Sequence, residues 1–462
     1  MLTILEILIV LTIIPVVIWA LLPVKRIPRI IDFLPLVSAL LLILHLFVDY
    51  EPMRLRLIPI YIISITIFII KAPRMFRHNP YLPKKRRVLS GVLRIISLMA
   101  IAAAVAVPTL ILPFYPTPEP TGEYNTGTVT CDLTDLSRPE LFTREDGDFR
   151  ELAVQFWYPT DAESGVKDID IENATLSADQ QTYPVLIFSH GAYGIRKSNE
   201  STFRELASHG YIVASIDHTY HAFYTAFPDG RTVMASQTFL NEVNMLENET
   251  LSAGQVFEIT NRWLKLRTDD INFVLDSMET GDLGEAGGLL DGRMNFSKIG
   301  LFGHSLGGAA AAQVCRERGD IKSVIVIDGT MIGDVTKING DYTEEVTRES
   351  FPEPIMLMYN ESYNDPEAKA SAYLPNINAF DNASGPAYAL YIKGAGHLNF
   401  TDLPSISPVL AGMMGTGSID SYNCMKTVND YTLAFFDKHL KGLSPALLED
   451  GVNDGKLLFQ IH

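Results

Sequence analysis

Hydrophobic positions follow two different patterns along the chain. The first 117 residues contain four long apolar runs, at residues 7–24, 33–48, 56–71 and 95–115, and most charged residues of this region lie between them or at their ends. A helix that crosses a membrane needs about 20 apolar residues. The pattern therefore predicts an all-α transmembrane region of four helices over residues 1–117.

The loops between these runs predict an orientation. Lysine and arginine are concentrated in the first loop, residues 25–32, and in the third, residues 72–94, whereas the second loop, residues 49–55, also carries acidic residues. Loops rich in Lys and Arg stay on the cytoplasmic side of a membrane. We therefore expect a multi-pass protein of the cell membrane whose catalytic part, after the fourth span, is extracytoplasmic.

The remainder of the chain shows alternating strand-like and helix-like patterns. Residues 118–149 begin with several Pro and Gly residues and are predicted to be a linker. Beyond them, short apolar runs alternate with amphipathic segments. Strands are expected at 151–159, 183–191, 211–218, 297–305, 321–329, 353–361 and 386–393, and helices at 201–210, 257–279, 306–318 and 421–443. This order implies an α/β domain over residues 150–462, with a mostly parallel sheet and helices on both faces.

Charge is divided as unevenly as hydrophobicity. The whole chain has a formal net charge of −17, but residues 1–118 carry a net +9 and the remainder −26. The acidic part would repel phosphates, so no nucleic-acid partner is expected. The three cysteines, Cys131, Cys315 and Cys424, do not form a disulfide framework. We favour three free thiols, and a disulfide between Cys131 and Cys424 stays an alternative.

No metal and no cofactor is predicted. The sequence has no CxxC or HExxH pattern. His218 and His221 have the spacing i, i+3, but no third ligand is in view, so a metal site is not favoured.

Residues 303–307 read Gly-His-Ser-Leu-Gly and fit the G-x-S-x-G pattern of a nucleophile elbow. The pattern requires a buried strand before the serine and a helix after it, and both are expected. Gly303 and Gly307 let the backbone pass closely beside a strained serine. The alternative is a chance Gly/Ser turn. With the strand and helix in place, we interpret Ser305 as the nucleophile of an α/β-hydrolase fold.

A serine nucleophile needs a base. His397 follows the last apolar strand and precedes the terminal helix, where this fold carries its catalytic histidine. His439 lies within that helix and His462 ends the sequence, so both are weaker candidates. His304, next to the serine, is interpreted as packing or hydrogen-bonding support.

The acid that orients the base is less clear from the pattern. Asp328 ends one strand, whereas Glu361 and Asp365 follow the next strand. A strand-end aspartate after a β-branched run is well placed to orient an imidazole. The pattern favours Asp328 over Glu361 without deciding between them.

Backbone donors for a developing oxyanion are expected at two turns. One is the N–H of Leu306, directly after the nucleophile, and the other is the N–H of Ala192, after the strand at 183–191. His190 and Gly191 would support the second turn. The alternative for these two residues is an ordinary strand-ending turn.

Six segments in order resemble the plasma-type platelet-activating factor acetylhydrolase family, isoform II, and its microbial relatives: VQFWYPT, PVLIFSHGAYGIR, LASHGYIVASIDH, LFGHSLGGAAAAQ, VIVIDGTM and YIKGAGHLNFTD. The likeness covers roughly residues 150–440, and the ordered set is more specific than the serine motif alone. It implies an α/β-hydrolase that cleaves esters without calcium. It also implies Ser305 as nucleophile, Asp328 as acid and His397 as base, with Leu306 and Ala192 as oxyanion donors.

The chain departs from the family pattern after Asp217 and His218, where it reads DHTYHAFY. If this loop lines the site, it brings His218, Thr219, Tyr220 and His221 near the substrate. Residues 222–255 are predicted to form a lid or rim.

The features together predict a membrane-anchored serine ester hydrolase. Its substrate is expected to be a small-molecule or lipid ester with a short-chain or oxidised acyl group, including esters at the sn-2 position of phospholipids. A dienelactone hydrolase, a polyester hydrolase or a peptidase on the same fold are alternatives, as is a catalytically inactive membrane scaffold. The intact Ser, Asp and His set favours an enzyme.

Overall fold

The computed structural model describes residues 4–21, 29–48, 58–59, 61–62, 66, 96, 99–100, 103, 106–108, 110–113, 115–143, 147–163, 170–449 and 455–462. The chain divides into two compact units. The first comprises Met1–Pro116 with Pro404–Met413, and the second comprises Thr117–Leu403 with Met414–His462.

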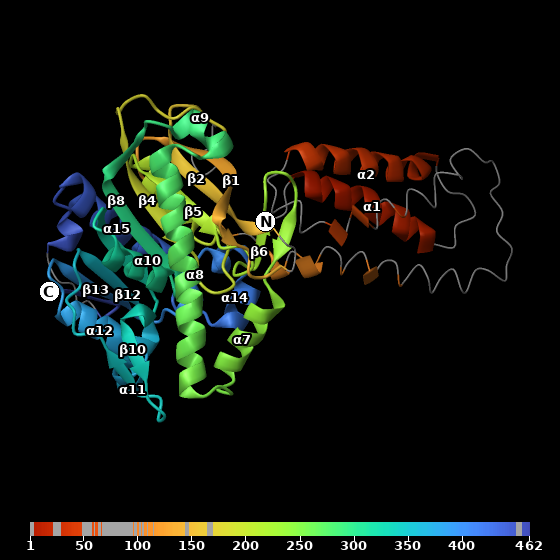
Figure 1. The fold of residues 1–462 in the computed structure, drawn as a ribbon. Coiled ribbons are helices and arrows are strands. Elements are labelled where there is room, and N and C mark those ends of the chain that lie inside the picture. The colour runs from red at the N-terminus through yellow and green to blue at the C-terminus, as the bar shows by residue number, and fades with distance from the viewer. Residues whose placement is uncertain are drawn as a thin grey trace. The chain divides into compact units, whose positions relative to one another are not determined.

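The first unit contains two helices that pack side by side, α1 (Ile4–Leu21) and α2 (Arg29–Val48) (Figure 1). Ile9 and Ile13 of α1 and Leu42 of α2 are buried. Many of the other described apolar side chains of these helices are exposed, including Leu11 and Leu40. Most of α14 (Pro408–Met414) also belongs to this unit.

The structure does not support the predicted transmembrane region of four helices. Among the residues that it describes, no helix is both long enough and apolar enough to cross a membrane. Helices α1 and α2 lie at the first two predicted spans, and α2 includes the charged residues Arg29 and Asp32. The third and fourth predicted spans, residues 56–71 and 95–115, fall largely outside the described residues. The extracytoplasmic location stays a prediction.

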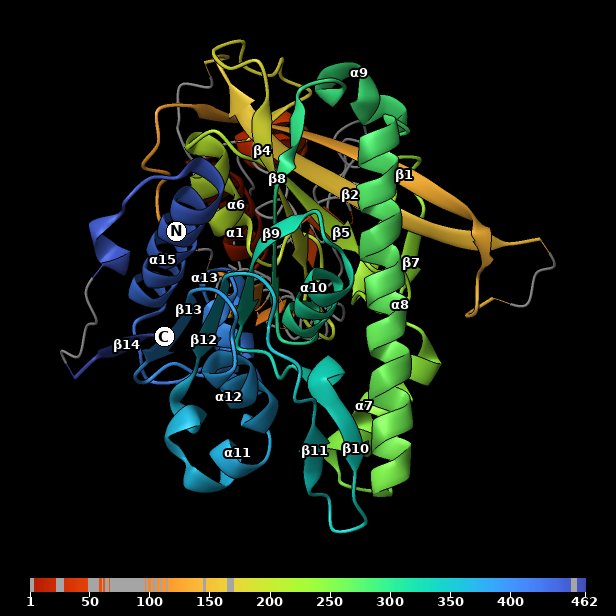
Figure 2. The same ribbon diagram turned by 60° about the vertical axis from the view of Figure 1, so that its left-hand side comes forward.

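The second unit is built on a sheet of ten strands in the order β14-β13-β12-β9-β8-β4-β5-β2-β1-β3 (Figure 2). The strands from β13 to β5 run parallel, and β14, β2 and β1 add antiparallel strands at the two sides. The mostly parallel sheet is therefore confirmed. The strand bounds are β1 (Asn125–Pro139), β2 (Phe149–Thr160), β3 (Ile171–Glu172), β4 (Tyr183–Ser189), β5 (Ile212–Asp217), β8 (Met294–His304), β9 (Ile321–Ile327), β12 (Ile355–Tyr359), β13 (Ala387–Ile392) and β14 (Leu457–Ile461).

Helices cover both faces of this sheet, as the strand sequences require. Val185 and Ile187 of β4 face one core, whereas Leu186 and Phe188 face the other, because successive side chains of a strand point to opposite faces. Both faces are buried, so the strands read as continuous apolar runs rather than alternating ones. The first core lies beneath α8 (Ala253–Thr280), α10 (Leu306–Glu317) and α12 (Leu374–Asp381), and the second beneath α6 (Glu200–Ser208) and α15 (Ser421–Lys441).

The long helix α8 begins and ends at strong sequence signals. Ser252 caps its first turn and forms a capping box with Gln255, and Gly281 ends it with a φ of 76°. Smaller elements complete the unit: the hairpins β6 (Tyr224–Ala226) with β7 (Thr232–Met234) and β10 (Val335–Ile338) with β11 (Glu344–Val346), and the helices α7 (Gln237–Glu247), α9 (Gly287–Leu290) and α11 (Pro366–Ala370). Most of the short helix α13 (Leu403–Ile406) belongs to the first unit.

Strand β1 corrects the linker predicted for residues 118–149. It pairs antiparallel with β2 and buries Cys131, Leu133 and Asp135, while Asp132 and Thr134 between them are exposed. The alternation is that of a strand with one covered face, but the segment is rich in Thr and Asp and follows a run of Pro and Gly. All three cysteines of the chain are buried free thiols.

Candidate active site

Ser305 occupies the sharp turn between β8 and α10. Its backbone has φ 54° and ψ −124°, a conformation that residues other than glycine rarely adopt. The turn requires glycine on both sides of the serine. A Cβ at Gly307 would overlap the carbonyl oxygen of Ser189, and a Cβ at Gly303 would overlap the backbone of Gly307. The local structure around Ser305 is therefore that of a nucleophile elbow.

Asp328 follows β9 and lies against the serine turn. The backbone N–H of Ser305 donates to the carbonyl oxygen of Ile327 at 2.8 Å. A Cβ at Gly329 would overlap the carbonyl oxygen of Ser305, so the chain after Asp328 passes very close to the serine. The neighbouring parallel strands β8 and β9 thus end at the same edge of the sheet and deliver Ser305 and Asp328 side by side.

His397 begins a short 3₁₀ helix (His397–Phe400) that follows β13. Its Nδ1 lies 2.6 Å from Oδ2 of Asp328. The Asp328 side chain is 1% exposed, whereas the His397 side chain is 42% exposed. Because a carboxylate only accepts hydrogen bonds, Nδ1 carries the proton in this contact. The lone pair of the neutral imidazole is then on Nε2, as a general base requires.

The other two candidate acids bind elsewhere. The Glu361 carboxylate accepts a hydrogen bond from the backbone N–H of Gly394. Asp365 caps α11 by accepting from the backbone N–H of Glu367 at 3.0 Å. The structure thus brings Asp328, rather than Glu361 or Asp365, to His397.

Asn360 is a candidate functional residue that the sequence does not reveal. It follows β12 and donates twice to Asp328, from its backbone N–H to Oδ1 at 2.9 Å and from Nδ2 to Oδ2 at 2.6 Å. Both bonds hold the carboxylate in the plane that faces His397. An asparagine after a strand is an ordinary turn residue, so no sequence signal marks this one.

His304, which directly precedes Ser305, contacts His397. Its Nε2 lies 3.1 Å from the carbonyl oxygen of His397, and the two imidazole rings are 4.5 Å apart between centroids. Burial, with a smaller effect of His397, lowers the pKa of His304 well below its usual value. A neutral His304 then donates Nε2–H to that carbonyl, and its role in supporting the site stays a prediction.

The loop after β4 lies directly against the serine. A Cβ at Gly191 would be 2.8 Å from Nδ1 of His304 and 3.2 Å from Cβ of Ser305. The loop therefore reaches the serine only because residue 191 is glycine. Ala192 follows in this loop, and Leu306 opens α10. The two predicted oxyanion donors thus come from the two segments that flank Ser305.

An apolar cluster from α7 and α8 borders these donors. Phe239, Val243 and Trp263 form a buried group, and the side chains of Ala192 and Leu306 pack against it. Helix α7 belongs to residues 222–255, the predicted lid or rim. Its packing places that segment beside the loop after β4, which contains Ala192, and its role as a lid stays a prediction.

The DHTYHAFY loop is more deeply buried than the sequence suggested. His218, Thr219 and His221 are each at most 2% exposed. His221 stacks on Phe239 with 4.1 Å between ring centroids, and Tyr220 has a φ of 68°. The loop therefore supports the apolar cluster and a buried polar network, with His218 and Thr219 in the network.

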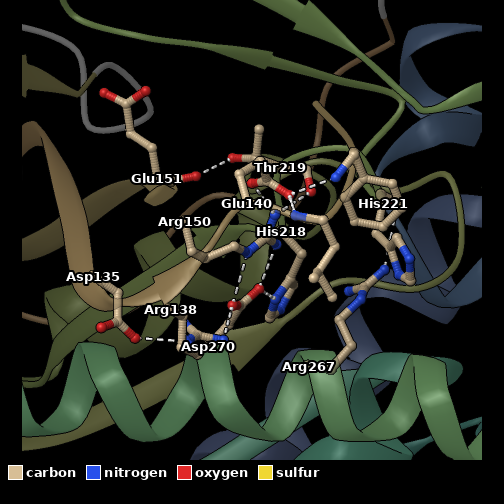
Figure 3. A network of polar contacts seen from close by, with 12 residues as sticks. Asp135, Arg138, Glu140, Arg150, Glu151, His218, Thr219, His221, Arg267 and Asp270 are labelled. Atoms are coloured by element: carbon tan, nitrogen blue, oxygen red, sulfur yellow. Dashed lines mark hydrogen bonds and ion pairs between the residues drawn. The ribbon is translucent and has the colours of Figure 1, made fainter. Parts of the chain in front are cut away.

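That network is centred on the carboxylate of Asp270, in α8 (Figure 3). Arg150 donates to both of its oxygens, at 3.0 and 2.7 Å, Arg138 lies 2.9 Å from Oδ1, and Nδ1 of His218 lies 2.9 Å from Oδ2. Burial alone would raise the pKa of this carboxyl, but Arg150 and His218 outweigh burial and hold the pKa well below its usual range. Asp270 is therefore a buried carboxylate anion.

The sequence of α8 contains a signal that indicates this buried network. Arg267 and Asp270 lie at the same spacing as Ile271 and Val274, on the face of α8 that is buried. Charged residues at positions expected to be apolar indicate a buried polar cluster. Their partner Arg150, however, lies on a distant strand, and no local pattern connects the two.

Comparison with known proteins agrees with this architecture. A family model described as platelet-activating factor acetylhydrolase, isoform II, matches residues 161–444. Platelet-activating factor acetylhydrolase of Cavia porcellus is 27% identical over 282 residues, which cover 56% of this chain and 58% of that protein. A probable 1-alkyl-2-acetylglycerophosphocholine esterase of Arthroderma benhamiae is 23% identical over 283 residues, covering 52% and 64%. The chain spans about three fifths of the length of the curated relatives it matches.

A solved structure is also similar. A ferulic acid esterase from Streptomyces cinnamoneus superimposes with a TM-score of 0.57 at 24% sequence identity, covering 75% of this chain and 99% of that one. At this identity the likeness concerns the fold, and it supports the α/β-hydrolase architecture predicted from the sequence.

Proposed function

Because the chain belongs to the platelet-activating factor acetylhydrolase isoform II family, we propose that it hydrolyses carboxylic esters with Ser305 as the nucleophile. The observation that carries this proposal is the 2.6 Å contact between His397 and the buried carboxylate of Asp328, at the strand edge where Ser305 holds its strained turn. An acid, a base and a half-buried, strained serine at one sheet edge are the parts that acyl transfer requires.

In the acylation step, Oγ of Ser305 attacks the ester carbonyl carbon while Nε2 of His397 takes the hydroxyl proton. The new C–O bond converts the carbonyl oxygen into an oxyanion, which accepts hydrogen bonds from the N–H groups of Leu306 and Ala192. Asp328 stabilises the imidazolium through Nδ1–H. Collapse of the tetrahedral intermediate breaks the bond to the alcohol, which leaves with the proton from Nε2.

Deacylation repeats this chemistry with water. His397 takes a proton from a water molecule, whose oxygen attacks the acyl carbon of the ester on Ser305. The second tetrahedral intermediate uses the same two N–H donors. Its collapse releases the carboxylic acid and returns the proton to Oγ of Ser305.

We propose esters with short or oxidised acyl groups as the substrate class, including those at the sn-2 position of phospholipids. The names of the relatives support this choice, because they denote an acetylhydrolase and an acetylglycerophosphocholine esterase. Partly buried apolar side chains that pack on the cluster of Phe239, Val243 and Trp263, among them Ala192 and Leu306, would give the acyl group an apolar surface.

The test is hydrolysis of p-nitrophenyl esters from acetyl to long-chain acyl, together with covalent labelling by a fluorophosphonate. We expect turnover to be highest for short chains and the label to be on Ser305. The Ser305→Ala variant should lose labelling and at least about 10⁴-fold in kcat. The control Ser297→Ala removes an exposed serine from the same strand and should keep both. Undiminished turnover in Ser305→Ala would refute the proposal.

A further inference from the structure

Helix α8 places a buried arginine behind the oxyanion loop. Arg267 has no exposed surface, and its guanidinium donates to the backbone carbonyl oxygens of His190 at 2.8 Å, Gly191 at 3.4 Å and His221 at 3.4 Å. Figure 3 shows Arg267 on α8 together with His221. Within the described part of the chain it has no ion-pair partner. Burying a guanidinium without a carboxylate costs several kcal/mol. Carbonyl dipoles of the loop offset part of this cost, so the arginine and the loop are energetically linked.

One of these carbonyls belongs to the peptide that carries the proposed oxyanion donor. The carbonyl of Gly191 and the N–H of Ala192 are the two ends of a single planar peptide group. The Gly191 oxygen also lies 2.7 Å from Nδ1 of His190 and accepts from the N–H of Gly194 at 3.0 Å. Holding the oxygen fixes the plane of the group and therefore the direction in which the Ala192 N–H points. Donors on the oxygen also polarise the group and strengthen its N–H as a donor.

We propose that Arg267 is a positioning residue for the oxyanion site, which orients and polarises the Gly191–Ala192 peptide through the Gly191 carbonyl. The inference rests on the proposed function, because it assigns Ala192 N–H to the oxyanion of that reaction. The positive charge of Arg267 would also stabilise the developing oxyanion directly, because a buried cation acts in a medium of low dielectric constant. Burial lowers the pKa of Arg267 to about 9, so the charge is present at neutral pH.

A neutral His190 completes the arrangement. Burial and the neighbouring Arg267 lower its pKa well below the usual value. The backbone N–H of His218 donates to Nε2 of His190 at 3.4 Å. With Nε2 accepting, the single proton of His190 is on Nδ1 and is donated to the Gly191 carbonyl.

The same loop is braced by a second Ser-His-Asp arrangement. Oγ of Ser189 lies 2.9 Å from Nε2 of His218, whose Nδ1 lies 2.9 Å from Asp270. These distances are typical of a catalytic triad, but all three side chains are at most 1% exposed, and Arg150 neutralises the carboxylate. No ester reaches Ser189. The arrangement therefore anchors the end of β4, where the oxyanion loop begins, and leaves the role of nucleophile to Ser305.

Arg267→Met tests the proposal by removing the donor and the charge while keeping much of the apolar volume. Loss of one direct oxyanion donor costs about 10²–10³-fold in kcat. Arg267 acts through a peptide that keeps two other hydrogen bonds, so we expect a smaller loss of about 10–100-fold in kcat with little change in KM. A trifluoromethyl ketone, which forms a tetrahedral oxyanion adduct with the serine, should lose affinity by the same factor.

Arg293→Met is the matched control. Arg293 also donates to three backbone carbonyls, but these precede β4, at the other end of that strand from Ala192; they belong to Ser177, Gln180 and Gln181. This variant should lose stability and keep kcat and the trifluoromethyl ketone affinity. A purely structural role of Arg267 would make both variants behave alike.

A second variant covers the case in which Arg267→Met does not fold. Arg267→Lys keeps the charge, but a single ammonium cannot reproduce the fork that bonds carbonyls of separate segments. We expect kcat and trifluoromethyl ketone affinity to fall together, by less than in the Met variant. Wild-type kcat in a folded Arg267 variant, or a fall in kcat without weaker ketone binding, would overturn the positioning role alone. Ester hydrolysis that survives Ser305→Ala would overturn it together with the proposed function.

Discussion

The carboxylate of Asp328 and the imidazole of His397 are 69 residues apart in the sequence and 2.6 Å apart in the structure. The carboxylate is almost completely buried, whereas the imidazole is open to solvent. Two hydrogen bonds from Asn360 hold the buried carboxylate of Asp328 in place. This carboxylate in turn orients the exposed ring of His397. This relationship links the core of the sheet to the proposed chemistry at its edge.

Replacing Asp328 by asparagine should abolish most activity without unfolding the protein. The amide keeps the shape of the side chain but stabilises the wrong tautomer of His397 and cannot stabilise the imidazolium. We expect kcat to fall by about 10⁴-fold with KM little changed. Steady-state kinetics with p-nitrophenyl acetate measures this.

Glu361→Gln is the matched control for that substitution. Glu361 is the competing candidate acid, and its carboxylate bonds the backbone of Gly394 instead of His397. We expect its kcat to stay within about threefold of the wild type. A large loss in Glu361→Gln with an active Asp328→Asn variant would reassign the acid.

Asp270→Asn should strongly destabilise the fold. The substitution removes the bidentate charge partner of Arg150, which has 3% of its side chain exposed and keeps only its single contact with Glu140, and it weakens the bonds to Arg138 and His218. Removing one partner of a buried ion pair costs about 3–5 kcal/mol. Urea unfolding at neutral pH measures this difference in the free energy of unfolding.

The neighbouring residue provides the control. Asp269 pairs with Lys265, whose side chain is 75% exposed, so Asp269→Asn should change the unfolding free energy by less than about 1 kcal/mol. Equal effects of the two substitutions would show that the Asp270 network contributes no more than a surface pair.

His221→Phe should make the protein less sensitive to acid. His221 is 2% exposed and stacks on Phe239, and its buried Nδ1 has no hydrogen-bond partner among the described residues. Burial, with the charges of Arg267 and Arg150, lowers its pKa well below 6.5. In the unfolded chain the pKa returns to about 6.5, so below that pH the unfolded state binds a proton that the folded state excludes. Wild-type stability therefore falls as the pH falls.

Phenylalanine preserves the stacking and removes this proton linkage. The free energy of unfolding of the variant relative to the wild type should rise by about 1.4 kcal/mol for each pH unit below 6.5. Urea unfolding at pH 7.5, 6.0 and 5.0 gives the three differences. A pH-independent difference would mean that folding does not lower the pKa of His221.

Local signals were sufficient for the elements that carry the proposed site. The strand–serine–helix order around Ser305 and the strand that precedes His397 are encoded by apolar runs and by glycines next to the turn, and each such signal involves neighbouring residues only. The structure contains both features at the expected positions. The catalytic roles of these residues stay predictions until the variants are measured.

Signals that depend on distant partners were missed or misread. Strand β1 is polar enough to be taken for a linker, and only its pairing with β2 makes its alternation meaningful. The four apolar runs near the N-terminus suggested membrane spans, yet no helix among the described residues satisfies the requirement for one. Most of the third and fourth runs lies outside those residues.

The sequence by itself determined the α/β domain, the serine turn and the place of His397 after the last strand of the parallel part of the sheet, because these follow from periodicity and from residues adjacent in the chain. Tertiary structure decided that Asp328, rather than Glu361, faces His397, and that Asn360 holds it. It also decided that His218 and Arg267 contact the end of β4 and the loop that follows it, through Ser189 and the carbonyl oxygen of His190. The physical reason is that a hydrogen bond or an ion pair depends on distances of about 3 Å between atoms, and the sheet creates those distances by aligning strands that lie far apart in the sequence.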